Sequence, residues 1–145
     1  MKSKSISTIS CMLVMFLVMT LAGAVVSADS SDSVFRFGPA NPKYVYFTEQ
    51  RAKENTSGSY VYYVEAQNQP NGTYFSIWSG GVNETTKGAG IIHVGQKRKI
   101  SQWVYEKGKR VCNLGVSPSG TAIVSNIAGL WSPDSVGNYP YCNLP

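Results

Sequence analysis

The sequence contains little of what catalytic and metal-binding sites are built from. Among its 145 residues there is one histidine, His93, there are three cysteines, and only 14% of the residues are charged. A Ser-His-Asp or Cys-His relay needs an imidazole as its base, and His93 lies in an Ile-Ile-His-Val segment typical of a strand interior. The chain also lacks the ligand clusters of zinc sites, the calcium-loop pattern and the glycine-rich phosphate-binding motif. We therefore expect no metal site and no cofactor.

Carboxylates are also scarce. Glycoside hydrolysis needs two of them across a cleft, and most of the six candidates stand beside Lys, Arg or turn residues, where solvated side chains are expected. The six are Glu49, Glu54, Glu65, Glu84, Glu106 and Asp134. Glu65 and Glu106 fall in predicted strands and are the pair that a wall- or glycan-active hydrolase would use. That is the least favoured alternative, and we expect a protein that is not an enzyme.

The N-terminus has the three parts of a secretory signal peptide. Lys2 and Lys4 precede an uncharged apolar run over residues 9–26, which ends in small residues at Val26-Ser27-Ala28. This pattern predicts cleavage after Ala28 and a secreted, extracellular protein. The alternative is an uncleaved membrane anchor, since about 18 apolar residues are close to the length that spans a bilayer.

Cleavage would leave 117 residues, with a disordered leader over 29–33 and one domain over 34–145. This segment has 11 basic and 8 acidic side chains, because the removed part carries two lysines and no acid. A net charge of +3 with mixed signs is not the footprint of a nucleic-acid-binding protein, so we expect no nucleic-acid partner. The charge is compatible with weak attraction to anionic cell walls or membrane surfaces.

Short segments rich in β-branched and aromatic residues alternate with clusters of Gly, Pro and Asn. This pattern predicts an all-β fold, an antiparallel β-sandwich of about eight to nine short strands, and it contains no convincing helical window. A small open barrel, a jelly roll and an immunoglobulin-like arrangement stay open as variants. The predicted strands cover residues 34–37, 43–48, 59–66, 73–79, 90–94, 99–106, 110–117, 121–125 and 127–131.

Aromatic residues are the most distinctive part of the composition. After residue 28 the chain holds nine Tyr, three Trp and four Phe. Tyr and Trp have flat apolar faces with a polar edge, which suits them to sugars and protein partners, although core packing is their ordinary role. A basic run, Lys97-Arg98-Lys99, follows in the predicted meander. It is either part of a binding surface or simply the solvated edge of a sheet. We expect a binding surface for a cell-wall polymer, a membrane surface or an extracellular protein, formed by Tyr60, Tyr62, Tyr63, Trp78, Lys97, Arg98 and Lys99.

The cysteine count favours export. Cys11 lies inside the apolar run and leaves with it, so Cys112 and Cys142 remain as an even number in an oxidising compartment. Pairing is then the default, and we predict a disulfide between them. The alternative is a redox-active or nucleophilic cysteine, which the absence of a Cys-x-x-Cys motif disfavours.

Three segments carry a resemblance to small secreted proteins of Gram-positive bacteria that are classed as a domain of unknown function. They are Phe35-Arg36-Phe37, Arg51-x-Lys53-x-Asn55 leading to Ser59-Tyr60-Val61, and the distinctive Gly129-x-Trp131-Ser132-Pro133-Asp134-Ser135. The resemblance implies a secreted bacterial β-rich protein and brings no known activity. More loosely, the chain is similar to bacteriocins of the lactococcin 972 type, which implies an exported antimicrobial protein.

The functional expectation follows from export, the lack of a catalytic set and the Tyr-rich strands. We expect a secreted, non-catalytic binding or interaction protein that acts at the cell surface or outside the cell. A bacteriocin-like antimicrobial protein is the first alternative.

Overall fold

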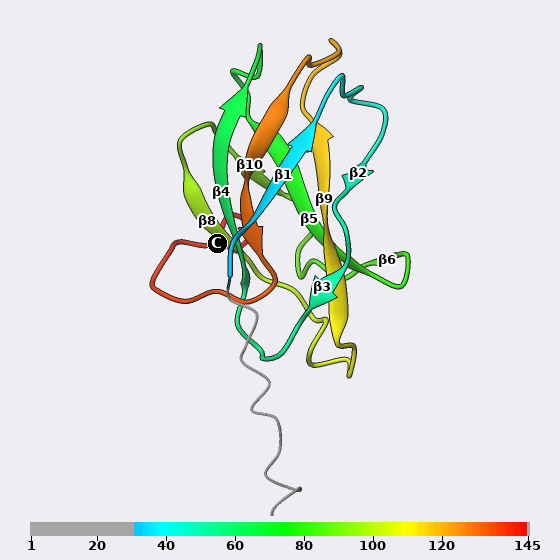
Figure 1. Cartoon of the computed structure of the whole chain (residues 1–145), viewed down its shortest axis with the longest axis vertical. Helices are drawn as coiled ribbons and strands as arrows, with labels where there is room; N and C mark the ends of the chain where they lie inside the picture. Colours follow the sequence, from blue (N-terminus) through cyan, green and yellow to red (C-terminus); the bar gives the residue numbers. More distant parts are fainter. Residues whose placement is uncertain (1–30, 145) are drawn as a thin grey trace, which may run out of the picture.

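A computed structural model describes residues 31–144 as two antiparallel sheets packed face to face (Figure 1). The predicted all-β sandwich is confirmed, with ten strands and no helix in this part of the chain. Accordingly, residues 31–144 include no helix with the length and hydrophobicity needed to cross a membrane. The predicted signal peptide at 1–28 lies outside the described residues.

The first sheet has four strands and the second has six. In the first, the spatial order is β1 (Ser33–Phe37), β10 (Ile127–Ser132), β4 (Ser59–Ala66) and β8 (Lys97–Ile100). In the second, the main path is β2 (Tyr46–Phe47), β9 (Val111–Pro118), β5 (Thr73–Ser79) and β6 (Val82–Asn83). Two short strands complete it, β3 (Arg51–Ala52) on β9 and β7 (Gly90–Ile92) on β5.

One side of the sandwich is closed by the turn between β7 and β8. Here Gly95 donates its N–H to the carbonyl of Tyr63 at 2.7 Å, and the carbonyl of Gln96 accepts the N–H of Tyr63 at 3.1 Å. The chain thus passes from the second sheet to the first on the side where β8 is the last strand of its sheet. On the other side β1 and β2 remain at the ends of their sheets.

The core lies between the two inner faces, as the period-2 alternation of a strand requires. In β4 this places Val61 and Tyr63 inside, both fully buried. Tyr63 is tolerated there because its hydroxyl is 2.7 Å from Thr73 Oγ1, which satisfies a polar group that would otherwise be buried unpaired. The other large buried apolar side chains are Phe35, Phe75, Ile77, Ile92, Ile100, Val104, Leu114, Val116, Val124, Ile127 and Trp131.

Some predicted strands are shorter than expected or absent. The segment 43–48 keeps only Tyr46–Phe47, and 121–125 forms no strand beyond a single bridge between Val124 and Ala40. The segment 99–106 leaves the sheet after Ile100, because Gln102 folds back and accepts the N–H of Val104 at 2.7 Å. In this segment a hydrogen bond from a local polar side chain thus takes the place of the strand-to-strand hydrogen bonds that the apolar pattern predicted.

The predicted disulfide between Cys112 and Cys142 is absent, and both residues are free thiols. Cys112 is buried on the inner face of β9, whereas Cys142 lies in the C-terminal segment against Gly90 of β7. In the second sheet β5 lies between β9 and β7, so the two thiols occupy different parts of the core. An even cysteine count sets a default for pairing but carries no information on which strands are neighbours.

Candidate functional site

Part of the predicted binding surface forms on the outer face of β4 and β8. Tyr60 is paired with Lys99 and Tyr62 with Lys97, so strand alternation places all four side chains on the face that points away from the core. The ammonium of Lys97 lies 4.9 Å from the centroid of the Tyr62 ring, within the range of a cation–π contact.

The C-terminal segment (135–144) extends this face. The backbone N–H of Lys99 donates to the carbonyl of Pro140, and the carbonyl of Lys99 accepts the N–H of Cys142, both at 2.9 Å. The segment therefore covers the outer edge of β8. Its Tyr139 packs on Tyr60 with ring centroids 4.8 Å apart, and Lys99 lies 4.7 Å from the centroid of the Tyr141 ring. We call the resulting set the Tyr–Lys surface: Tyr60, Tyr62, Lys97, Lys99, Tyr139 and Tyr141.

A cavity of about 320 Å³ opens on the Tyr–Lys surface. Tyr60, Tyr139 and Lys97 line it together with Asp32, Val136 and Asp134. Burial, followed by the nearby Tyr139 and Asp32, raises the pKa of Tyr60 to about 12, so its phenol is neutral at physiological pH. The cavity therefore offers apolar ring faces, a phenol hydroxyl, the ammonium of Lys97 and the exposed carboxylate of Asp32 to a ligand.

The remaining predicted residues do not join this surface. Tyr63 is in the core, and Trp78 lies in β5 of the other sheet, where its indole N–H donates to Ser76 Oγ at 2.8 Å. Arg98 alternates with Lys97 and Lys99 along β8, so its side chain leaves the opposite face of the sheet, the one on which its partner Val61 lies. Sequence reasoning also missed Tyr139 and Tyr141, which follow the last strand and carry no strand pattern of their own.

The residues weighed for catalysis are apart from one another. His93 is exposed in the turn after β7 rather than inside a strand, and its backbone N–H donates to Gln96 Oε1 at 3.1 Å. Glu65 stands near the end of β4 and Glu106 in the turn before β9. The end of β4 and the start of β9 lie at opposite ends of the sandwich (Figure 1). No group of three or more metal-ligating side chains occurs within residues 31–144.

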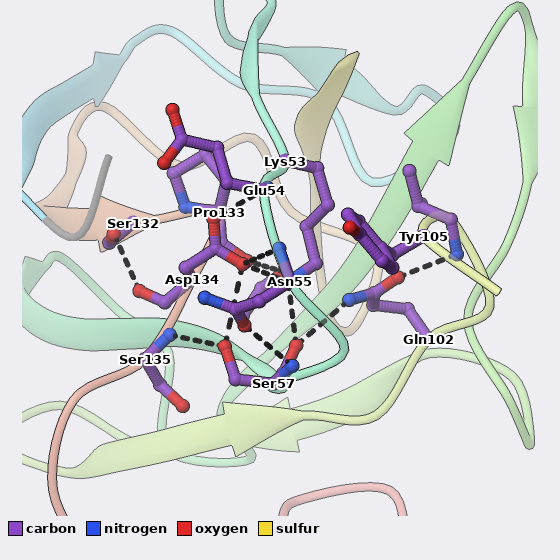
Figure 2. Close-up of polar contacts among 12 residues, drawn as sticks. Lys53, Glu54, Asn55, Ser57, Gln102, Tyr105, Ser132, Pro133, Asp134 and Ser135 are labelled. Atoms are coloured by element: carbon purple, nitrogen blue, oxygen red, sulfur yellow. Dashed lines mark hydrogen bonds and ion pairs between the residues drawn. The ribbon is translucent and has the colours of Figure 1, made fainter. Parts of the chain in front are cut away.

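Two of the segments behind the family resemblance meet in a buried polar cluster (Figure 2). Lys53 and Asp134 form an ion pair with side chains that are 0% and 1% exposed. The carboxylate of Asp134 also accepts the N–H of Glu54 at 3.0 Å and the N–H of Asn55 at 3.3 Å. Several buried donors on one carboxylate offset the cost of removing it from water.

Serine side chains complete this cluster. Ser57 lies at the centre of the cluster. The backbone carbonyl of Ser57 accepts a hydrogen bond from the ammonium of Lys53 at 2.7 Å, and Ser57 Oγ accepts one from the N–H of Ser135 at 3.0 Å. The hydroxyl of Ser59, the residue directly before the buried Tyr60, donates to the carbonyl of Pro133 at 2.8 Å. We call Lys53, Ser57, Ser59 and Asp134 with these bonds the Lys53–Asp134 cluster. It fixes the point at which the chain leaves β10 and starts across the Tyr–Lys surface.

Arg51 and Trp131 add a second link between the same two segments. The guanidinium of Arg51 donates to the carbonyl of Trp131 at 3.0 Å and lies 5.6 Å from the centroid of its ring. A hollow of about 580 Å³ on the open side of the sandwich is lined by both residues and by β1. None of the predicted binding residues lines it.

A separate buried charge occurs at Glu84, which directly follows β6. Its side chain is 1% exposed and forms ion pairs with Lys107, at 2.7 Å, and with Lys109. Burial alone would raise the pKa of Glu84, but hydrogen bonds and charge from the two ammoniums lower it below the usual value. This triad joins β6 to the turn before β9.

The family model described as a protein of unknown function (DUF2712) matches residues 22–135. The chain belongs to this family. No curated protein and no solved structure matches it. The DUF2712 match includes both halves of the Lys53–Asp134 cluster and ends at Ser135, so Tyr139 and Tyr141 of the Tyr–Lys surface lie beyond it.

Proposed function

We propose that this DUF2712 protein is a secreted, non-catalytic binding protein whose Tyr–Lys surface binds an anionic polymer of the cell surface. The observation that carries the proposal is the pairing of rings with ammoniums on one face. Tyr62 lies beside Lys97, and Tyr141 lies beside Lys99, next to the cavity at Tyr60.

The chemistry of this surface fits a polymer that has both sugar rings and acidic groups. Tyr ring faces stack on the apolar faces of sugars, and their hydroxyls bond to sugar hydroxyls. The ammoniums of Lys97 and Lys99 attract phosphate or carboxylate groups as compact charges. An extended polymer also suits a face that runs along β8 and the adjacent C-terminal segment.

Export is part of the proposal and rests on the signal-peptide pattern at the N-terminus. Protein recovered from the culture medium should begin at Asp29. A chain that keeps its first 28 residues in the cell or the membrane would contradict this part.

The binding experiment uses purified protein, intact cells and isolated cell walls, with and without chemical extraction of the anionic polymer. We expect sedimentation of the protein with untreated walls, weaker binding as salt increases, and a loss of binding after extraction. The variant Lys97→Gln/Lys99→Gln should lose at least tenfold in affinity, and Tyr62→Ala should lose severalfold.

The matched control is Lys43→Gln/Lys87→Gln. It removes the same charge from two exposed lysines outside the Tyr–Lys surface and should bind like the wild type. Equal loss in both double variants would show that net charge alone drives the binding, and the proposed site would be wrong.

A bacteriocin-like action is the second candidate, and it rests on the predicted export, the net positive charge and the loose resemblance to the lactococcin 972 type. The same purified protein distinguishes the two. Growth arrest or killing of related strains would favour the antimicrobial role, whereas binding to cells that keep growing favours a binding protein.

A further inference from the structure

The contact between Lys53 and Asp134 brings an amine and a carboxyl group together at a place closed to solvent. Their side chains are 0% and 1% exposed, and they join the segment after β3 to the end of β10 (Figure 2). An ion pair of two fully buried charges is costly, because both groups have lost their contact with water.

The donors around Asp134 are arranged differently on its two oxygens. Oδ2 accepts the N–H of Glu54 at 3.0 Å. Oδ1 contacts the ammonium of Lys53 and also accepts the N–H of Asn55 at 3.3 Å and the hydroxyl of Ser57 at 3.4 Å. Figure 2 shows the Glu54 side chain turned away from the contact, so its carboxylate takes no part.

We propose that Lys53 and Asp134 condense within the folded chain to form an intramolecular isopeptide bond. A proton first passes from the ammonium of Lys53 to Oδ1 of Asp134, which leaves both groups neutral. The amine lone pair then attacks Cγ of Asp134, and the Nζ–Cγ bond forms.

The bond between Cγ and Oδ1 breaks as a second proton moves from Nζ to Oδ1, and Oδ1 leaves as water. Oδ2 remains as the amide oxygen on the N–H of Glu54. The reaction turns one ammonium and one carboxylate into one amide and one water molecule, so it needs no oxidant or activating co-reactant.

The surroundings supply what this step needs. The backbone N–H of Glu54 is placed to stabilise negative charge on Oδ2 as the carbon becomes tetrahedral. The carbonyl of Ser57 holds Nζ at 2.7 Å, so the amine is oriented before reaction. The hydroxyl of Ser57 lies against the leaving oxygen and is the side-chain group placed to relay its proton.

A second Lys–carboxylate contact in the same protein provides an internal comparison. Glu84 is as buried as Asp134, but its partners Lys107 and Lys109 have side chains that are 54% and 33% exposed. Because water reaches both of these amines, the pairs should remain ionic. The proposal therefore predicts one isopeptide bond, at Lys53 and Asp134.

Mass spectrometry of the folded full-length protein, or of its processed form from the medium, tests the proposal. The denatured wild-type protein should be lighter than its sequence by one water molecule. Trypsin should fail to cut after Lys53, and the digest should contain one branched peptide that holds both Lys53 and Asp134. The branched peptide distinguishes this bond from loss of water elsewhere in the chain.

The variants Lys53→Arg and Asp134→Ala should show the full sequence mass, whereas Glu84→Gln should keep the deficit of one water. The wild-type result decides the matter even if the first two variants fail to fold. Wild-type protein of full mass, with normal cleavage after Lys53 and separate peptides, would show that the contact is only an ion pair.

Discussion

The rings of Tyr60 and Tyr139 pack on each other with centroids 4.8 Å apart, although one belongs to β4 and the other to the segment after the last strand. This contact makes the outer face of the first sheet dependent on a piece of chain that forms no strand. It also buries Tyr60 to 7% exposure, although strand alternation points it outward.

The buried phenol of Tyr60 predicts a loss of stability at alkaline pH. Burial first, then Tyr139 and Asp32, raises the pKa of Tyr60 from 10.0 to about 12. A pKa that is higher in the folded state gives a stabilisation that is complete below pH 10 and is lost as the pH approaches 12. The free energy of unfolding, measured with urea across this range, should fall with pH.

The variant Tyr60→Phe should reduce this pH dependence without abolishing it. Tyr63, Cys112 and Cys142 have raised pKa values too, through burial, and they lose stabilisation over an overlapping range. A Tyr60→Phe protein whose stability falls as steeply as that of the wild type between pH 10 and 12 would contradict the assignment.

Both cysteines should be unreactive thiols in the native protein. Burial raises the pKa of Cys112 to about 12 and that of Cys142 to about 11, so little thiolate is present at neutral pH. We expect slow alkylation of the folded protein at pH 8 and rapid alkylation of both sites in denaturant without any reductant. Peptide mapping identifies the modified sites, and a peptide linked through Cys112 and Cys142 would contradict the structure.

The close approach of Gly90 and Cys142 predicts how firmly the C-terminal segment is held. A Cβ on Gly90 would overlap Sγ of Cys142, so Gly90→Ala should displace the segment and speed the alkylation of Cys142 at least tenfold. The midpoint of thermal unfolding should fall by several degrees.

The double variant Gly90→Ala/Cys142→Ala supplies the control, because it removes the sulfur that the new methyl group meets. It should recover part of the lost thermal stability. An equal loss in the single and double variants would place the damage in β7 itself rather than at this contact.

The alternation of residues 59–66 holds in β4 as far as Tyr63, with Val61 and Tyr63 in the core and Tyr62 on the outer face. Beyond Tyr63 the register with β10 shifts by one residue, at a bulge beside Gly129. Gly129 has no room for a side chain, since a Cβ there would overlap the carbonyl of Tyr62 and the ring of Phe35. That close approach involves three strands, so the local sequence did not reveal it.

The candidate site was predictable only where it lies on strands. Tyr60 and Tyr62 were named because they belong to a Tyr-rich strand-like segment. Lys97 and Lys99 were named because they belong to a basic run, and pairing of β4 with β8 brings the four residues together. Asp134 looked like a surface carboxylate, because nothing near it in the sequence indicates that Lys53 lies against it. Such a contact depends on the meeting of the segment after β3 with the end of β10, which is set by the whole topology.

The buried carboxylate of Glu84 predicts a specific loss on neutralisation. Glu84→Gln would leave Lys107 and Lys109 without a counter-charge at a side chain that is 1% exposed. Because both lysines reach solvent, we expect a loss of about 2 kcal/mol in the free energy of unfolding rather than the full cost of breaking a buried pair.

The pH dependence of this loss has a definite sign. The pKa of Glu84 is lowered in the folded state, so its stabilisation is present at neutral pH and disappears as the pH falls through that lowered value. The wild type and Glu84→Gln should therefore converge in stability in strong acid. Glu106→Gln, which changes an exposed carboxylate in the same turn as Lys107, is the matched control and should stay within about 0.5 kcal/mol of the wild type. Equal destabilisation by both substitutions at neutral pH would mean that the turn responds to net charge and not to the buried triad.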